Sequence, residues 1–220
     1  ELESGLAVRA RLGAGLIEAD FEELGVRALR DVLAKNPGFE QADILIVLNY
    51  LHQKNVPEAI RAAQEYLVRN PSSATSYDLL GRAYIASEDR QNAEVAFKKA
   101  LELRPGDPGA CASLANFALL DSDFEAARNY YKQILEHNPD HMEARLRIAA
   151  SYAVEGKGQE MLDNLQATAA AYPRALEPRL VMARYYIGMG QLGEVMPLFE
   201  HLTEEQLEHP DTLETLAAYE

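Results

Sequence analysis

Prolines recur along this 220-residue chain at a fixed interval of 34 residues. They stand at Pro37, Pro71, Pro105, Pro139 and Pro173. The loops of a single globular core differ in length, so such a core gives no reason for this regularity. A chain of identical supersecondary units does, because each unit must end at the same point. The interval therefore predicts a repeat protein, and with it a recognition surface rather than a catalytic pocket.

The unit 74–107 carries small and apolar residues at the spacing of two helices. Its positions 4, 7, 8 and 11 lie on one face of a first helix, and positions 20, 24 and 27 lie on one face of a second. Small residues at positions 8 and 20 let the two axes approach, and the proline at position 32 ends the second helix. The residues at these positions are Tyr77, Leu80, Gly81, Tyr84, Ala93, Phe97, Ala100 and Pro105.

This pattern resembles the tetratricopeptide repeat (TPR) at its signature positions. The resemblance implies an all-α fold, a right-handed TPR superhelix (α-solenoid) of antiparallel helix pairs, in which each pair buries its apolar face against the next. We expect a single array over residues 1–220, with six repeats and a partial seventh. Their bounds are 6–39, 40–73, 74–107, 108–141, 142–175, 176–209 and, for the partial repeat, 210–220.

The pattern weakens toward the end of the chain. Pro197 falls inside the second helix of the unit 176–209 and is expected to delay or kink its first turns. Leu207 stands where the terminating proline is missing. Because the chain starts at Glu1 rather than a methionine and stops at Glu220 in an unfinished unit, we expect it to be a segment of a longer protein.

The charge balance excludes some classes of partner. The chain holds 35 acidic and 21 basic residues, a formal net charge of −14. Nucleic acids and anionic lipid surfaces attract basic proteins, so neither is an expected partner. The longest apolar run, Ile44–Leu48, is too short to span a bilayer, and no transmembrane segment is expected in this chain. A solvated acidic surface that keeps an elongated protein soluble explains the charge.

Some residues match motifs of cofactor or metal sites, but the structure predicted around them does not suit such sites. Gly188–Gly193 matches G-x-G-x-x-G, but a dinucleotide site needs a preceding strand, and this motif follows a predicted helix. His137 and His141 are separated by Pro139, so they share no helical face and do not suggest zinc. Cys111 occupies an apolar core position and is expected to be buried. We therefore expect no cofactor, no metal and no enzymatic activity.

The resemblance also implies where a ligand binds, because first-helix positions 2, 5, 6, 9, 12 and 13 line the concave groove of TPR folds. Aliphatic side chains dominate these positions, and the arginines among them offer forked donors for a carboxylate or an amide. In the alternative interpretation, the arginines pair with Asp78 or Glu143 and the aliphatic residues pack between units. The predicted groove residues are Ile44, Leu48, Asp78, Arg82, Asn116, Leu146, Arg147, Leu180 and Arg184.

Four stretches are similar to a narrower family, the TPR lipoproteins that accompany the PEP-CTERM/exosortase sorting system of Gram-negative bacteria. These stretches are 40–51, 77–84, 113–116 and 177–186. The family is associated with exopolysaccharide production. The similarity implies a non-catalytic protein–protein interaction scaffold in the bacterial envelope, periplasmic or anchored to the outer membrane by a lipid outside this segment.

Two other functions fit the same repeats. One is a cytosolic TPR adaptor that binds a partner peptide, and the other is the docking arm of an enzyme whose catalytic domain lies outside the segment. In each case the expected partner is a protein or peptide in the concave groove. The sequence leaves the partner's identity, the compartment and the oligomeric state open.

Overall fold

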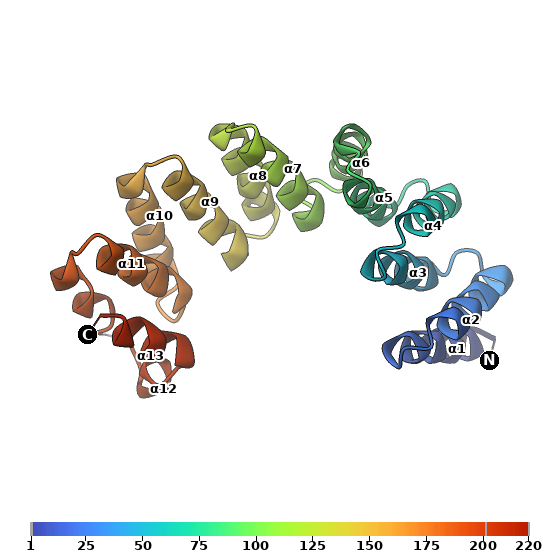
Figure 1. Cartoon of the computed structure of the whole chain (residues 1–220), viewed down its shortest axis with the longest axis horizontal. Coiled ribbons are helices and arrows are strands. Elements are labelled where there is room, and N and C mark those ends of the chain that lie inside the picture. The colour runs from blue at the N-terminus through green and yellow to red at the C-terminus, as the bar shows by residue number, and fades with distance from the viewer. Residues whose placement is uncertain (1, 201, 220) are drawn as a thin grey trace. The chain divides into compact units, whose positions relative to one another are not determined.

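A computed structural model of the chain describes residues 2–200 and 202–219 (Figure 1). Within those residues every regular element is a helix and no strand occurs, as the sequence predicted for an all-α fold. The elements are α1 (Leu2–Glu18), α2 (Glu22–Lys35), α3 (Glu40–His52), α4 (Val56–Arg69), α5 (Ala74–Ala86), α6 (Arg90–Leu103), α7 (Pro108–Leu120), α8 (Phe124–His137), α9 (Met142–Val154), α10 (Gly158–Ala171), α11 (Glu177–Gly188), the 3₁₀ turns η1 (Leu192–Glu194) and η2 (Met196–Leu198), α12 (Glu204–Leu207) and α13 (Pro210–Ala217).

The helix ends repeat with the period of the prolines. We call the prolines that recur every 34 residues the ladder prolines. In each of the first five pairs the second helix ends two residues before a ladder proline, and these helices are α2, α4, α6, α8 and α10. The residue between the helix end and the proline has left the helical conformation, with φ of −140° at Asn36 and −132° at Asn70. A proline pushes the preceding residue toward extended backbone, so each ladder proline ends its helix at the same point.

The turn inside each helix pair has a fixed backbone conformation. One residue of the turn adopts a positive φ, between 56° and 82°, and it recurs every 34 residues. Only the last two of these residues are glycines, although glycine adopts this conformation at the lowest cost. The six residues are Asp20, Lys54, Glu88, Ser122, Gly156 and Gly190. Gly190 belongs to the G-x-G-x-x-G match, so the structure places that motif in a turn between helical segments, as predicted.

The contacts within the chain divide it between Leu114 and Ala115, inside α7, into two units that are described separately. In the first unit, α1 to α6 pack in pairs, and residues of α1 to α5 form a continuous core (Figure 1). Fully buried side chains of second helices belong to it, among them Leu29 and Tyr66, and Phe97 of α6 is fully buried as well. The predicted core position of Cys111 is also buried, and its thiol is not exposed.

Small residues set the separation of the paired helices in the first unit. A Cβ added to Gly25 of α2 would lie 2.6 Å from the carbonyl oxygen of Gly13 in α1. In the third pair, a Cβ added to Gly81 would lie 2.6 Å from the ring of Phe97. Real side chains do not tolerate such distances, so glycine at position 8 or 20 is a packing requirement of these pairs.

The second unit has its own core, which involves α9, α10 and α11 and continues to the broken helix after them. Leu165 of α10, Met182 of α11 and Val195 are almost fully buried there. Where the pattern predicted a delayed or kinked second helix around Pro197, the structure has the two 3₁₀ turns η1 and η2. Proline removes a backbone donor and clashes with the preceding turn of an α-helix, which accounts for the change.

Candidate functional site

Two predicted groove residues of α5 form an ion pair. The Nε atom of Arg82 lies 2.8 Å from Oδ2 of Asp78, one helical turn away, and the Arg82 side chain stays nearly half exposed. The pair lies beside the first turn of α7, since a Cβ added to Gly109 would be 2.9 Å from both Arg82 and Asp78. The alternative predicted for Arg82, a pair with Asp78, is therefore present. A ligand carboxylate would have to compete with Asp78 for this guanidinium.

Asp78 is a buried carboxylate, only 7% exposed. Its Oδ1 atom has no hydrogen-bond partner among the described residues. Burial raises the pKa of the Asp78 carboxyl more than Arg82 lowers it, and the charge of Asp107 adds to the rise. An acceptor held in this way favours a donor, such as an amide or a cation, over a second anion beside Arg82.

The predicted aliphatic positions of α3 differ in exposure. Leu48 is 40% exposed, whereas Ile44 is half-buried and packs against the core of the first unit. Helix α3 contacts α5, so these residues and the Asp78–Arg82 pair belong to neighbouring first helices of one unit. Of these two predicted residues, Leu48 is the one whose side chain is available to a partner.

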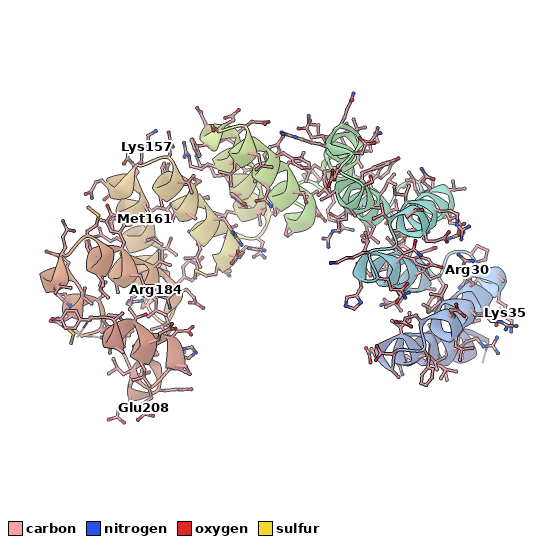
Figure 2. The ribbon with its side chains drawn as sticks, in the orientation of Figure 1. Arg30, Lys35, Lys157, Met161, Arg184 and Glu208 are labelled. Carbon is pink, nitrogen blue, oxygen red and sulfur yellow. The ribbon has the colours of Figure 1, made fainter. Side chains whose placement is uncertain are left out.

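In the second unit the predicted residues divide between surface and core. Arg147 and Arg184 are exposed, as is Asn116 in the part of α7 that belongs to this unit. Arg147 pairs along α9 with Glu143, with 2.6 Å between Nε and Oε1, which is again the predicted alternative. Figure 2 labels Arg184 on α11, and among the described residues it has no ion pair within 4.0 Å. Arg184 is thus the predicted arginine that is most accessible to a ligand anion.

The two predicted leucines of the second unit lie deeper. Leu146 is half-buried against the core of the unit, and Leu180 is part of that core at 5% exposure. Both leucines thus contribute to the core that α9, α10 and α11 share. Leu180 also lines a cleft, so its small exposed surface faces a cavity rather than open solvent.

That cleft, which we call the C-terminal cleft, was not predicted from the sequence. Its volume is 1080 Å³, and it lies between the start of α9, the α10–α11 loop, α11 and the starts of α12 and α13. Gln206 of α12 fixes one wall, because its Nε2 donates a 2.8 Å hydrogen bond to the carbonyl of Arg174 in the loop. Lining residues are Met142, Ala171, Tyr172, Pro173, Arg174, Ala175, Leu176, Glu177, Leu180, Thr203, Glu205, Gln206, His209 and Asp211.

The geometry offers little to a cofactor. Among the described residues no group of three or more His, Cys, Asp or Glu side chains is arranged to hold a metal ion. In the same part of the chain, no helix combines the length and the apolar character needed to cross a membrane. His141 is instead used locally, where its Nδ1 accepts a hydrogen bond from the backbone of Ala144 at the start of α9.

Solved structures of other proteins have the same arrangement of helix pairs as this chain. Solved structures of Pseudomonas aeruginosa PilF and of PilW, a type IV pilus biogenesis factor, are similar over nearly the whole length of both chains. For PilF the TM-score is 0.67 at 15% identity, covering 98% of each chain. For PilW it is 0.65 at 16% identity, covering 96% of this chain and 98% of that one. At these identities the similarity shows the fold.

A sequence relative covers half of this chain. Cellulose synthase operon protein C of Pseudomonas fluorescens (strain SBW25) is 27% identical over 53% of the chain. This chain spans only 12% of that protein's length. Family models described as tetratricopeptide repeat match residues 74–107, and 23–74 together with 114–176. These matches cover more than half of the sequence and coincide with the helix pairs, so the chain belongs to the tetratricopeptide repeat family.

Proposed function

We propose that this chain is a non-catalytic scaffold segment of a bacterial envelope lipoprotein that takes part in exopolysaccharide production. The coarser part of the proposal, a TPR-type protein-interaction scaffold, rests on the matched repeats and on the TPR folds of its structural neighbours. The finer part is supported by one observation above all. Its sequence relative is named as a protein of a cellulose synthase operon, and cellulose is an exopolysaccharide.

The first-helix surface supplies the binding chemistry in this proposal. The first unit presents the exposed Leu48 on α3 and the exposed Arg82 on α5, two helices that contact each other, and the second unit presents the exposed Arg184 on α11. The Arg82 side chain is nearly half exposed whereas Asp78 is buried, so a partner's polar group can reach the guanidinium from the solvent side while the pair with Asp78 stays in place. A partner peptide would bury an apolar side chain on Leu48 and direct an anionic or amide group to the arginines.

Genetic complementation in the source bacterium tests this proposal. Deletion of the gene should lower secreted exopolysaccharide, and the wild-type gene should restore it. A variant that carries Arg82→Glu and Arg184→Glu should fail to restore it, because the anchoring cations become anions. The matched control carries Lys98→Glu and Lys132→Glu, two exposed cations on the second helices α6 and α8, outside the predicted groove and with the same change of charge.

Cell fractionation, together with the complementation results, can contradict either part of the proposal. Recovery of the full-length protein in the cytosol, with unchanged polysaccharide in the deletion strain, would reject the envelope role in favour of a cytosolic adaptor. Full restoration by the double arginine variant would reject the predicted groove residues and leave the envelope role intact. The two parts of the proposal therefore fail separately.

A further inference from the structure

The C-terminal cleft combines an apolar floor with an acidic rim. Leu180 is almost fully buried, and Leu176 and Met142 are half-buried, so the aliphatic atoms at the bottom of the cleft are only partly shielded from water. A volume of 1080 Å³ is comparable to the largest clefts that bind drug-sized ligands, at about 1,000 Å³. The cleft therefore has room for several large side chains of a partner.

The rim is strongly unbalanced in charge. Three exposed carboxylates, Glu177, Glu205 and Asp211, surround the opening, and among the described lining residues Arg174 is the one Lys or Arg. His209 offsets the acidity only when protonated, and its ring lies 3.9 Å from Asp211. The rim thus attracts cations.

The sequence around the cleft extends this acidity. After Arg184 every charged residue of the chain, the histidines aside, is Asp or Glu. Glu208, labelled in Figure 2, is exposed and lies between α12 and α13 in the chain. Regions of one sign of charge raise the local concentration of oppositely charged partners and speed their association. The negative field therefore covers the whole end of the second unit.

The broken helix explains why the cleft is here. In the first five pairs the second helix runs for 14 residues and ends two residues before the ladder proline. In the sixth pair only the four residues of α12 are helical near that end. The start of this short helix is held by a capping box between Thr203 and Gln206, and both of these residues line the cleft. The cleft wall is therefore a capped, defined element rather than an open chain end.

We propose that the C-terminal cleft binds a segment of a partner protein that carries aliphatic side chains flanked by Lys or Arg. The aliphatic side chains would occupy the floor at Leu176 and Leu180, and the basic ones would meet Glu177, Glu205 and Asp211 on the rim. This inference rests on the proposed scaffold function, but it concerns a site other than the predicted arginines, which favour anionic groups. The two sites thus select partners of opposite charge.

Fluorescence anisotropy with a labelled peptide tests the proposal on the whole chain. The probe has leucines at i, i+4 spacing with lysines between them, and two matched peptides replace the leucines by serine or the lysines by glutamate. We expect saturable binding of the first peptide and at least about tenfold weaker binding of each matched peptide, equal to about 1.4 kcal/mol. Equal binding of the serine peptide would overturn the proposal, because charge alone would then account for the affinity.

Variants of the protein locate the site. The double variant Glu177→Lys with Glu205→Lys and the single variant Ala171→Trp, which fills the cleft without changing charge, should each weaken binding. Their controls are Glu136→Lys with Glu160→Lys, and Ala167→Trp on the same helix, all exposed and outside the cleft lining. Circular dichroism should show that all four proteins keep their helical content. Weakening by the controls to the same degree would overturn the assignment.

The competing occupant is a second copy of this chain. Sedimentation velocity over a range of concentrations would then show a dimer that Ala171→Trp abolishes, and this result would also overturn the proposal. Loss of peptide binding in the cleft variants, with full binding retained in the Arg82→Glu and Arg184→Glu variant, would support it. The reverse pattern would assign the peptide to the first-helix arginines instead.

Discussion

Gly25 lies where the backbones of α1 and α2 come closest, and it carries a prediction at the scale of one residue. Gly25→Ala places a methyl group 2.6 Å from the Gly13 carbonyl and from Ile17, so it should lower the free energy of unfolding by about 1–3 kcal/mol. Gly15→Ala is the matched control in α1, where a Cβ meets no atom within 4 Å. It should stabilise the helix by up to about 1 kcal/mol. Urea denaturation measures both, and equal effects would contradict the packing argument.

Cys111 gives a second prediction at this scale. Its thiol is fully buried, and burial, with a contribution from Asp107, raises its pKa to about 12. Because the thiolate is the reactive form, the native protein should not react with iodoacetamide at pH 8, whereas the protein in guanidinium chloride should react completely. Mass spectrometry counts the adducts. Labelling of the native protein at the rate of a free cysteine would show that the thiol is accessible.

The turns inside the helix pairs carry a prediction at the scale of structural elements. Lys54 and Glu88 adopt φ of 56° and 61°, in the left-handed region that costs a non-glycine residue about 1–2 kcal/mol. Lys54→Gly and Glu88→Gly should therefore raise the thermal midpoint, while Gly156→Ala, at φ 82°, should lower it. Differential scanning calorimetry measures the three shifts. A decrease for both glycine variants would mean that backbone entropy outweighs strain in these turns.

The ends of the second helices follow from the sequence, because each is set by a proline two residues further on. The prolines at position 32 and the small residues at positions 8 and 20 specify α2 to α10 by short-range sterics. The sixth pair differs, because Pro197 was expected to kink a helix and two 3₁₀ turns formed instead. Whether a kinked helix survives depends on the tertiary contacts available to the freed backbone groups, and these are not encoded in the local pattern.

The excess of carboxylates acts on the whole molecule. With 35 acidic and 21 basic residues, repulsion among like charges should lower the stability of the folded chain at low ionic strength. Raising NaCl from 20 mM to about 0.5 M shortens the Debye length and should raise the thermal midpoint by a few degrees. Choline chloride at equal ionic strength is the control for specific ion effects. A midpoint that falls with both salts would mean that screened ion pairs, such as Arg147–Glu143, contribute more than the repulsion.

At the scale of the whole molecule, the sequence by itself determined the repeat length, the all-α class, the end of each second helix before a recurring proline, and the burial of Cys111. Each depends on residues close together in one unit, where backbone sterics and helical spacing decide the outcome. The tertiary structure alone decided that Leu180 packs in the core, that the carboxylate of Asp78 is buried, and that a cleft opens beside α12. These outcomes depend on which segments from different repeats meet, and on the side-chain rotamers and desolvation that result, so no pattern within one 34-residue unit contains them.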